Sequence, residues 1–398
     1  MVGASLAGGR AAEALRREGH DGPITLIGAE PHPPYDRPPL SKQVLAGTMP
    51  HEQTALRLDP DLGADLRLGV RASGLDLDRR RLVLEGGEEL AVDGVVLATG
   101  AHPRVPPGLG GLEGVFVLRT LDDCLALRDA VVKGSPRVVV VGAGFIGSEV
   151  AATCHSLGVD TTVIEALPVP LVRAIGEEMG RVCAALHTDH GVNLRLGVGV
   201  DGLEGDGPGG RSGRVVAVRL ADGSEVAADV VLIGIGVKPT TDWLASSGLD
   251  VADGLLCDQR CRALAGGRPL PWVVAAGDMV RWRHPVHGAD VRVEHWTNAV
   301  EQGEAAARAL LRGEEADPFA PVPYFWSDQY DTKIQFVGLA EPGDEVQVME
   351  GSIEERRFVA AFGRDGRLVA ALAFNRPPRI MKYRALLATG APFPPPPP

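Results

Sequence analysis

The sequence contains no run of about 18 apolar residues, the length that a membrane-spanning helix needs. Its first segment is interrupted by Arg10, Glu13 and Arg16, so a secretory signal peptide is not expected either. Its five cysteines include no Cys-x-x-Cys pair, which argues against a disulfide framework and favours a reducing compartment. We therefore expect a cytoplasmic protein. The closest pair, Cys257 and Cys261, has a spacing that fits neither a common zinc site nor a dithiol redox motif, so no metal site is expected.

Positive charge is also in short supply. Acidic residues outnumber basic ones by 52 to 40, and the formal net charge of −12 argues against nucleic acid as a general partner. The chain has 398 residues, 45% of them hydrophobic, which is enough for about two to three domains with their own cores. Arginine carries most of the positive charge, because the only lysines are Lys42, Lys133, Lys238, Lys333 and Lys382.

A turn rich in small residues opens the chain at positions 3–8, which read Gly-Ala-Ser-Leu-Ala-Gly, and it runs directly into a helical pattern. Such a turn at a helix N-terminus presents unpaired amides to a pyrophosphate. The next strand, expected at residues 24–27, ends near an acid that can bind ribose hydroxyls. Taken alone this is a weak indicator, since many helices begin with such turns. The candidate contacts are Gly3, Ser5, Gly8 and Glu30, with Ser5 where the pattern has its second glycine.

Only Met1 and Val2 precede this turn, although a fingerprint of this kind follows a central strand of its sheet. Two explanations stay open. The natural start lies further upstream, or the domain folds without a strand in the middle of its sheet.

A second, more complete segment begins at Val138–Val141, a β-branched run typical of a strand buried on both faces. Residues 142–147 read Gly-Ala-Gly-Phe-Ile-Gly, a helix follows, and the next strand, at residues 161–164, ends at Glu165. An acid at this place accepts from both ribose hydroxyls and repels a 2′-phosphate, which favours NAD over NADP. Two such segments predict two dinucleotides, and a flavin beside a nicotinamide provides a direct hydride path. The contacts assigned here are Gly142, Gly144, Gly147 and Glu165, and we add Gly236 to the cofactor-binding set.

Six further motifs extend along nearly the whole chain. With them the sequence resembles the NADH-dependent ferredoxin reductases of oxygenase systems. The motifs are Tyr-Asp-Arg-Pro-Pro-Leu-Ser-Lys at 35–42, Leu-Ala-Thr-Gly at 97–100, Leu-Arg-Thr-Leu-Asp-Asp at 118–123, Ala-Ala-Gly-Asp at 275–278, Glu-His-Trp-Thr-Asn-Ala at 294–299 and Trp-Ser-Asp-Gln-Tyr at 326–330.

The resemblance implies an α/β fold with two Rossmann-like dinucleotide-binding domains, one inserted in the other, and a small α+β C-terminal domain. It implies that a hydride passes from NADH to FAD, and single electrons then pass to an iron–sulfur ferredoxin serving a haem or Rieske-type oxygenase. We expect the FAD domain at residues 1–110 and 230–305, the NAD domain at 111–229 and the C-terminal domain at 315–398. Its short strands are expected near 333–337, 345–349, 357–362 and 367–373, followed by a helix near 378–387 and a stiff proline tail, Pro394–Pro398.

The same resemblance assigns roles to individual residues. Lys42 and Glu149 are expected to pair beside the reactive flavin nitrogen, although a purely structural ion pair is the alternative. Phe145 is expected to cover the flavin until the nicotinamide displaces it, and an ordinary packing role is the alternative. The implied FAD contacts are Ala7, Glu30, Arg37, Lys42, Ala72, Arg119, Asp278 and Trp296.

Rival functions on the same scaffold are a rubredoxin reductase, an NADH oxidase or disulfide-reductase-like enzyme, and a non-enzymatic redox-sensing flavoprotein. A disulfide-reducing enzyme needs a reactive cysteine near the flavin, but the expected loop offers Ser41 and Lys42. Cys124, Cys154 and Cys183 fall in helical stretches that we expect to lie away from the flavin motifs.

Two arginine-rich clusters are candidates for docking an acidic ferredoxin, because the net charge of the chain would otherwise repel it. An ordinary solvated charged face is the alternative reading of both. One cluster is Arg376, Arg379, Lys382 and Arg384, and the other includes Arg281 and Arg283.

Overall fold

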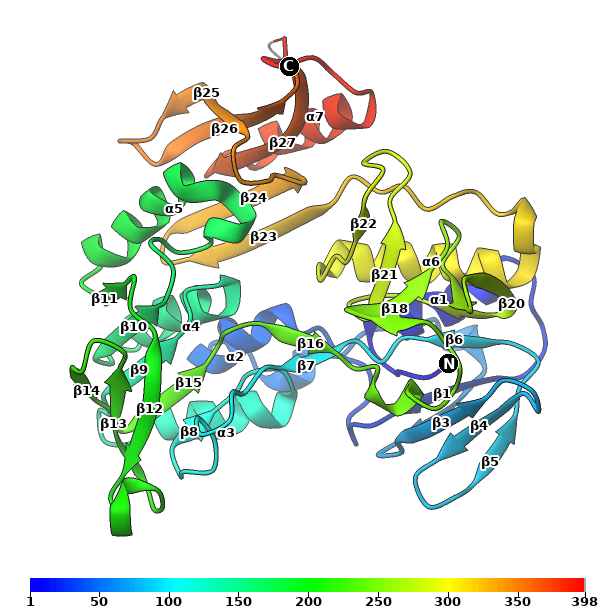
Figure 1. Cartoon of the computed structure of the whole chain (residues 1–398), viewed down its shortest axis with the longest axis horizontal. Coiled ribbons are helices and arrows are strands. Elements are labelled where there is room, and N and C mark those ends of the chain that lie inside the picture. The colour runs from blue at the N-terminus through cyan, green and yellow to red at the C-terminus, as the bar shows by residue number, and fades with distance from the viewer. Residues whose placement is uncertain (397–398) are drawn as a thin grey trace. The chain divides into compact units, whose positions relative to one another are not determined.

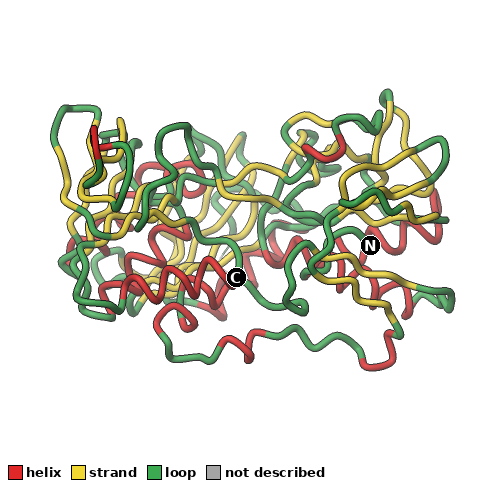
Figure 2. The backbone as a smooth tube through the Cα atoms, turned by 90° about the horizontal axis from the view of Figure 1, so that it is seen from below, coloured by secondary structure: helices red, strands yellow, loops and turns green. Residues whose placement is uncertain are grey.

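The computed structural model describes residues 1–396 and divides into two compact units (Figures 1 and 2). Unit 1 contains Met1–Asp36, Thr54–His102 and Lys238–Pro323, and unit 2 contains Arg37–Gln53, Pro103–Val237 and the chain from Tyr324 onward. The chain passes from one unit to the other after Asp36, Gln53, His102, Val237 and Pro323, and the third and fourth of these points lie in strands β7 (Ala101–Pro103) and β16 (Val237–Pro239). Within residues 1–396, no helix is long and apolar enough to cross a membrane.

The first residues of the chain complete the parallel part of the sheet in unit 1. Val2 bridges in parallel to Ile27 on one side and to Leu97 on the other. Its amide donates to Val96 O at 2.9 Å, and its carbonyl accepts from the amide of Ala98 at 2.7 Å. One bridging residue therefore occupies the place of the central strand. The strands of unit 1 are β1 (Ile24–Gly28), β2 (Ala64–Leu68), β3 (Ala72–Asp76), β4 (Arg81–Leu84), β5 (Glu89–Ala91), β6 (Val95–Leu97), β17 (Val251–Ala252), β18 (Gly254–Cys257), β19 (Arg262–Ala265), β20 (Arg268–Ala275), β21 (Val280–Arg283) and β22 (Asp290–Val291).

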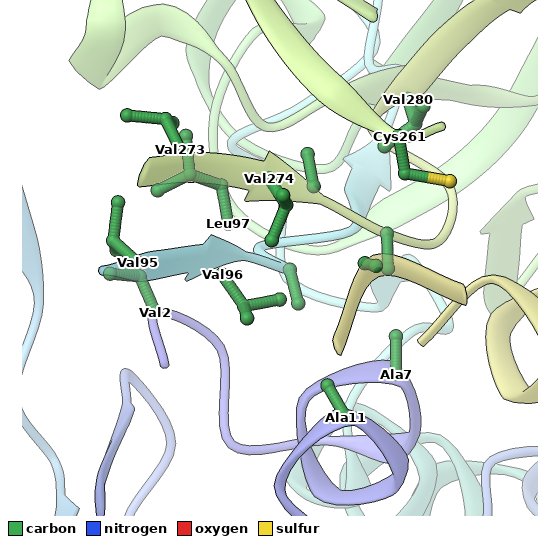
Figure 3. Packing of buried hydrophobic residues seen from close by; sticks show 14 of the residues in the cluster. Val2, Ala7, Ala11, Val95, Val96, Leu97, Cys261, Val273, Val274 and Val280 are labelled. Atoms are coloured by element: carbon green, nitrogen blue, oxygen red, sulfur yellow. The ribbon is translucent and has the colours of Figure 1, made fainter. Parts of the chain in front are cut away.

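Helices α1 (Leu6–Arg17) and α6 (Trp296–Arg312) pack closely together in unit 1. Ala7 and Ala11 of α1 lie below strands β6 and β20, whose valines form the core (Figure 3). A Cβ atom on Gly303 of α6 would lie 2.6 Å from the Ala7 carbonyl oxygen, so only glycine allows this approach. Small residues therefore bring both helices against the sheet.

A five-stranded parallel sheet with the order β11-β10-β9-β15-β8 forms the core of the nucleotide-binding part of unit 2. The Val138–Val141 run is strand β9, and all four residues are buried, as the sequence predicts. Together with unit 1, this sheet confirms the α/β class. The elements are α2 (Gln43–Ala46), β8 (Val115–Phe116), α3 (Leu121–Val131), β9, α4 (Phe145–Ser156), β10 (Thr161–Glu165), α5 (Val172–Asp189), β11 (Asn193–Leu196), β12 (Val200–Gly205), β13 (Val215–Leu220), β14 (Glu225–Ala227) and β15 (Val230–Ile233).

The C-terminal part of unit 2 is a five-stranded antiparallel sheet, with α5 packed on its aromatic face. The four strands and the helix expected from the sequence are present, but the sheet also has a first strand, β23, which contains the first four residues of the Trp-Ser-Asp-Gln-Tyr motif. The residues before the predicted proline tail are held by the hydrogen bond from Phe393 N to Gly366 O (2.9 Å), and Pro397 and Pro398 lie outside the described residues. The elements are β23 (Tyr324–Gln329), β24 (Thr332–Gly338), β25 (Glu345–Ser352), β26 (Arg357–Arg364), β27 (Arg367–Phe374) and α7 (Pro377–Ala388).

A buried histidine joins α5 to the turn after β23. His187 is fully buried, and its Nδ1 lies 2.8 Å from the hydroxyl of Tyr330. Burial, and to a smaller extent the nearby charge of His190, lowers the pKa of His187 from 6.5 to about 4. The folded protein therefore holds this imidazole neutral at a pH where the unfolded chain protonates it.

The stability of the protein should consequently depend on pH through His187. Because the unfolded chain binds a proton that the folded chain excludes, this contribution is intact above pH 6.5 and is lost as the pH falls toward 4. The free energy of unfolding should fall by about 2 kcal/mol between pH 7.5 and pH 5 on account of this residue. His187→Gln should flatten that dependence in urea unfolding, whereas His102→Gln, at an exposed position, should not. Identical pH dependence in His187→Gln and wild type would contradict this account.

Candidate nucleotide-binding and redox site

Both glycine turns have the same local geometry, one in each unit. Gly3 has a φ of +115°, and a Cβ on it would lie 2.1 Å from the Ala98 carbonyl oxygen. Gly142 has a φ of +100°, and a Cβ on it would lie 2.5 Å from the Gly234 carbonyl oxygen. Side chains at either position would both strain the backbone and collide with the neighbouring strand end. The sequence therefore folds each turn against a parallel strand.

The last glycine of each turn is required for a second close contact. A Cβ on Gly8 would lie 2.0 Å from Gly3 O, and one on Gly147 would lie 2.0 Å from Gly142 O. The middle position differs, because Ser5 has an extended backbone with a φ of −128° that any residue can adopt. This explains how serine replaces the glycine of the pattern without strain.

The helix N-termini that follow these turns fit a pyrophosphate. Helix α1 begins after Ser5 and helix α4 after Gly144, and neither of these N-cap residues makes a side-chain cap hydrogen bond. The first turns, residues 6–9 and 145–148, contain no acidic residue. Amides that lack a protein acceptor, together with the positive end of the helix dipole, favour an anionic ligand.

Glu165 lies at the end of β10 and holds the second turn in place. Its Oε2 accepts from the amide of Ala143 at 2.8 Å, and its Oε1 accepts from the amide of Leu167 at 2.8 Å. The carboxylate is half-buried, and each oxygen retains a lone pair for a ribose hydroxyl. Sequence reasoning assigned this residue only to the ribose, whereas the structure also gives it a role in ordering the turn.

The remaining candidates of unit 1 lie around its strand ends. Glu30 follows β1 and accepts a hydrogen bond from the Tyr35 hydroxyl, and Ala72 begins β3. Asp278 follows Gly277, whose amide donates to Gln302 Oε1 at 2.8 Å. Sequence reasoning missed Gln302, which is buried in α6 and orders this turn.

Four further candidates are Trp296 in unit 1 and Arg37, Arg119 and Gly236 in unit 2. Trp296 is the first residue of α6, and its indole Nε1 donates to Asp36 at 2.8 Å. In unit 2, the Arg37 guanidinium donates to the backbone carbonyl of Arg119 at 2.7 Å, which joins the loop that contains Arg37 to the segment before α3. Gly236 follows β15 with a φ of +103°.

Lys42 and Glu149 form a largely buried ion pair in unit 2. Lys42 Nζ lies 2.8 Å from Glu149 Oε2, and the exposed fractions of the two side chains are 12% and 4%. Ser41 donates its hydroxyl to the same oxygen, and Thr153 Oγ1 donates to the Ser41 carbonyl at 2.7 Å. Residues 107 positions apart are thus joined by a charge-assisted bond in a site from which water is mostly excluded.

Phe145, the first residue of α4, packs against Phe325 of β23 with ring centroids 4.4 Å apart. It remains partly exposed, so the ring has a packed face and an open face. The contact supports the packing interpretation and leaves the flavin-covering role as a proposal.

All five cysteines are free and buried. Burial raises the pKa of the thiols of Cys124, Cys154 and Cys183 to about 12, and it also raises the pKa of Cys257 and Cys261. We expected Cys124 to lie away from the flavin motifs, but its thiol donates to the Leu40 carbonyl at 3.1 Å, inside the 35–42 motif. It is still a thiol rather than a thiolate at neutral pH, so it cannot act as the nucleophile of a disulfide reductase.

Two dinucleotide-type turns, with a buried lysine–glutamate pair, define a flavoprotein oxidoreductase of the two-nucleotide class. The pyridine nucleotide-disulphide oxidoreductase profile matches residues 1–303, and a reductase C-terminal profile matches residues 324–396. The chain belongs to the pyridine nucleotide-disulphide oxidoreductase family, and it is an enzyme that uses FAD and NAD(H).

Relatives that share the full domain arrangement are ferredoxin reductases. The chain is 36% identical to rhodocoxin reductase of Rhodococcus erythropolis, over 99% of this chain and 90% of that protein. It is 38% identical to the ferredoxin–NAD(+) reductase component of the anthranilate 1,2-dioxygenase system of Burkholderia cepacia, over 98% of this chain and 94% of that protein. The solved covalent putidaredoxin reductase–putidaredoxin complex matches with a TM-score of 0.90 and 32% identity, over 98% of this chain and 93% of that one.

The position of Glu165 predicts cofactor preference. Glu165→Gln removes the charge that repels a 2′-phosphate but keeps one acceptor for the turn amides, so the ratio of kcat/KM for NADH to that for NADPH should fall by about tenfold. The two values are measured with ferricyanide as acceptor. Asp201→Asn removes an equal charge at an exposed position of the same part of the chain and should leave the ratio unchanged. A wild-type enzyme that prefers NADPH would overturn the assignment.

Proposed function

We propose that this chain is an NADH-dependent ferredoxin reductase that supplies electrons to an oxygenase system. The observation that carries the proposal is the buried Lys42–Glu149 pair, in a loop where a disulfide-reducing relative needs a reactive cysteine. Similarity to ferredoxin reductases over 98–99% of the chain, including the C-terminal domain, supports the same assignment. Free cysteines fit a reducing cytoplasm.

The proposed division of labour is the one expected from the sequence. Residues 1–110 and 230–305 bind FAD, residues 111–229 bind NADH, and residues 315–398 form the C-terminal domain. FAD held by the first segment would supply the chemistry that links two-electron hydride transfer from NADH to single-electron transfer to an iron–sulfur acceptor. The protein supplies position and charge: the α1 and α4 N-termini bind phosphates, and Glu165 binds the NADH ribose.

Lys42 and Glu149 would act beside the reactive nitrogen of the flavin. Lys42 supplies a cation, and the buried carboxylate of Glu149 holds that cation in one geometry. Because a low-dielectric site strengthens each charge, the pair can tune the flavin without forming a covalent bond to it. Proximity and orientation of the two nucleotides then provide most of the acceleration.

The proposal is tested with the purified holoenzyme, NADH and a panel of acceptors. A ferredoxin of an oxygenase system should be reduced at least about tenfold faster than rubredoxin or a small disulfide, because no reactive thiolate is present in the Ser41–Lys42 loop. Each reaction is followed by the absorbance of the acceptor at saturating NADH. Faster reduction of rubredoxin, or of a disulfide, would replace the proposal with the corresponding rival.

The ferredoxin is proposed to dock on basic residues of the C-terminal domain or of β21. The structure modifies the first cluster, because Arg379 is ion-paired with Glu350 of β25 at 2.6 Å and Arg376 is half-buried. In the second cluster, Arg283 is exposed but lies 3.8 Å from Asp290. Lys382 is exposed on α7, next to the exposed side chain of Met381, and is a candidate for contact with an acidic partner.

Charge reversal at Lys382 tests the docking site. Lys382→Glu should slow ferredoxin reduction by about threefold to tenfold at low salt and flatten its salt dependence, because electrostatic steering is screened within about 8 Å at physiological ionic strength. Lys133→Glu, an equal reversal at an exposed position after α3, is the matched control. The rate at which NADH bleaches the flavin checks the fold of both variants. An equal effect of the two reversals would remove α7 from the docking site.

A further inference from the structure

Strand β23 of the C-terminal domain places alternate side chains against helix α4. Phe325 contacts Phe145, and two residues later the hydroxyl of Ser327 donates to Glu149 Oε1 at 2.9 Å. Phe145 and Glu149 are four residues apart on α4 and therefore share one face of the helix. Two residues that are two positions apart on the strand therefore contact two residues that are one turn apart on the helix. These two helix residues are the ones that the proposed reaction uses.

The hydrogen bonds of Glu149 come from two different parts of the chain. Ser41 and Lys42 both donate to Oε2, whereas Ser327 donates to Oε1. The Ser327 hydroxyl oxygen in turn accepts a hydrogen bond from Gln329 Nε2 at 3.2 Å. A hydroxyl has only one proton, and Ser327 donates it to Glu149, so the hydrogen bonds run in one direction from Gln329 through Ser327 to Glu149. Ser327 and Gln329 are fully buried, and Glu149 is 3% exposed.

A carboxylate in such a place depends on every donor it has. Burial disfavours the charged form, and each hydrogen bond to the charged form favours it. Lys42 and Ser41 satisfy one oxygen only, so removal of the Ser327 hydroxyl would leave Oε1 without this donor. The carboxylate would then be held at one oxygen only, by Ser41 and Lys42, and its orientation toward Lys42 would be less well fixed.

We propose that Ser327, oriented by Gln329, is a positioning residue that holds the Glu149 carboxylate in the orientation that pairs with Lys42, so that the C-terminal domain controls the placement of this ion pair beside the nicotinamide and the flavin. This inference rests on the proposed function. Ser327 acts through Glu149 and is not itself a catalytic residue. The C-terminal sheet consequently has a part in the hydride step in addition to any part in docking a ferredoxin.

The first test is Ser327→Ala in the holoenzyme. The acid limb of the pH profile of kcat/KM for NADH should move to higher pH by about one pH unit, the change expected from losing one hydrogen bond to a charged group. The reduction potential of the bound FAD, followed by absorbance during titration with a reference dye, should differ from the wild-type value, because the Lys42–Glu149 pair is no longer held in one geometry.

The second test separates positioning from simple support of the fold. In a Glu149→Gln background the charge is already absent, so adding Ser327→Ala should change neither the pH profile nor the potential further. Gln335→Leu is the matched structural control, because Gln335 is a buried glutamine of the same sheet whose Nε2 donates to Tyr324 instead, at 2.7 Å. It should lower the melting temperature and leave both readouts at the wild-type values.

The outcomes distinguish this inference from the proposed function. Wild-type protein that binds no FAD, or whose flavin NADH does not reduce, would overturn the proposed function itself. A wild-type reaction that proceeds, with Ser327→Ala showing the wild-type pH profile and potential, would overturn only the role of Ser327. An effect of Ser327→Ala that persists in the Glu149→Gln background, or that Gln335→Leu reproduces, would assign Ser327 to folding alone.

Discussion

The buried carboxylate of Glu149 is the constraint on which the arrangement of unit 2 depends. A charge in this position would be costly without donors, and the donors come from the loop at residues 37–42 and from strand β23. Each segment must dock against α4 for the carboxylate to be satisfied. The Lys42–Glu149 ion pair is therefore needed for the packing of unit 2, and it can also have the proposed role beside the flavin.

Close backbone approach is the second constraint, and it operates in both units. Gly3 and Gly142 let a turn meet a neighbouring strand end at distances that a side chain would prevent, and Gly303 lets α6 meet α1. As a result, two helix N-termini point their amides toward places where a phosphate can bind. The proposed phosphate sites thus depend on glycines, which have no side chain, rather than on reactive groups.

Departures from the sequence predictions have local physical causes. Ser5 is tolerated because its backbone is extended, and Val2 forms bridges on both sides where a longer strand was expected. Cys124 lies against the 35–42 motif because α3 packs on that loop, a contact that the helical pattern of α3 cannot reveal. Strand β23 was overlooked because its motif was interpreted as a family signature, although Phe325, Ser327 and Gln329 already alternate as buried strand residues do.

The sequence by itself determined the features that depend on local backbone chemistry: the two glycine turns, the buried valine strand before the second turn, and the order of β24 to β27 and α7 in the C-terminal domain. These are readable because positive φ, periodicity and helix capping act over a few residues. Only the tertiary structure decided that Ser327, 178 positions after Glu149, donates to that carboxylate, and that all five cysteines are buried as inert thiols. Such contacts depend on how sheets and helices pack, and that packing brings together residues whose spacing in the chain carries no signal of it.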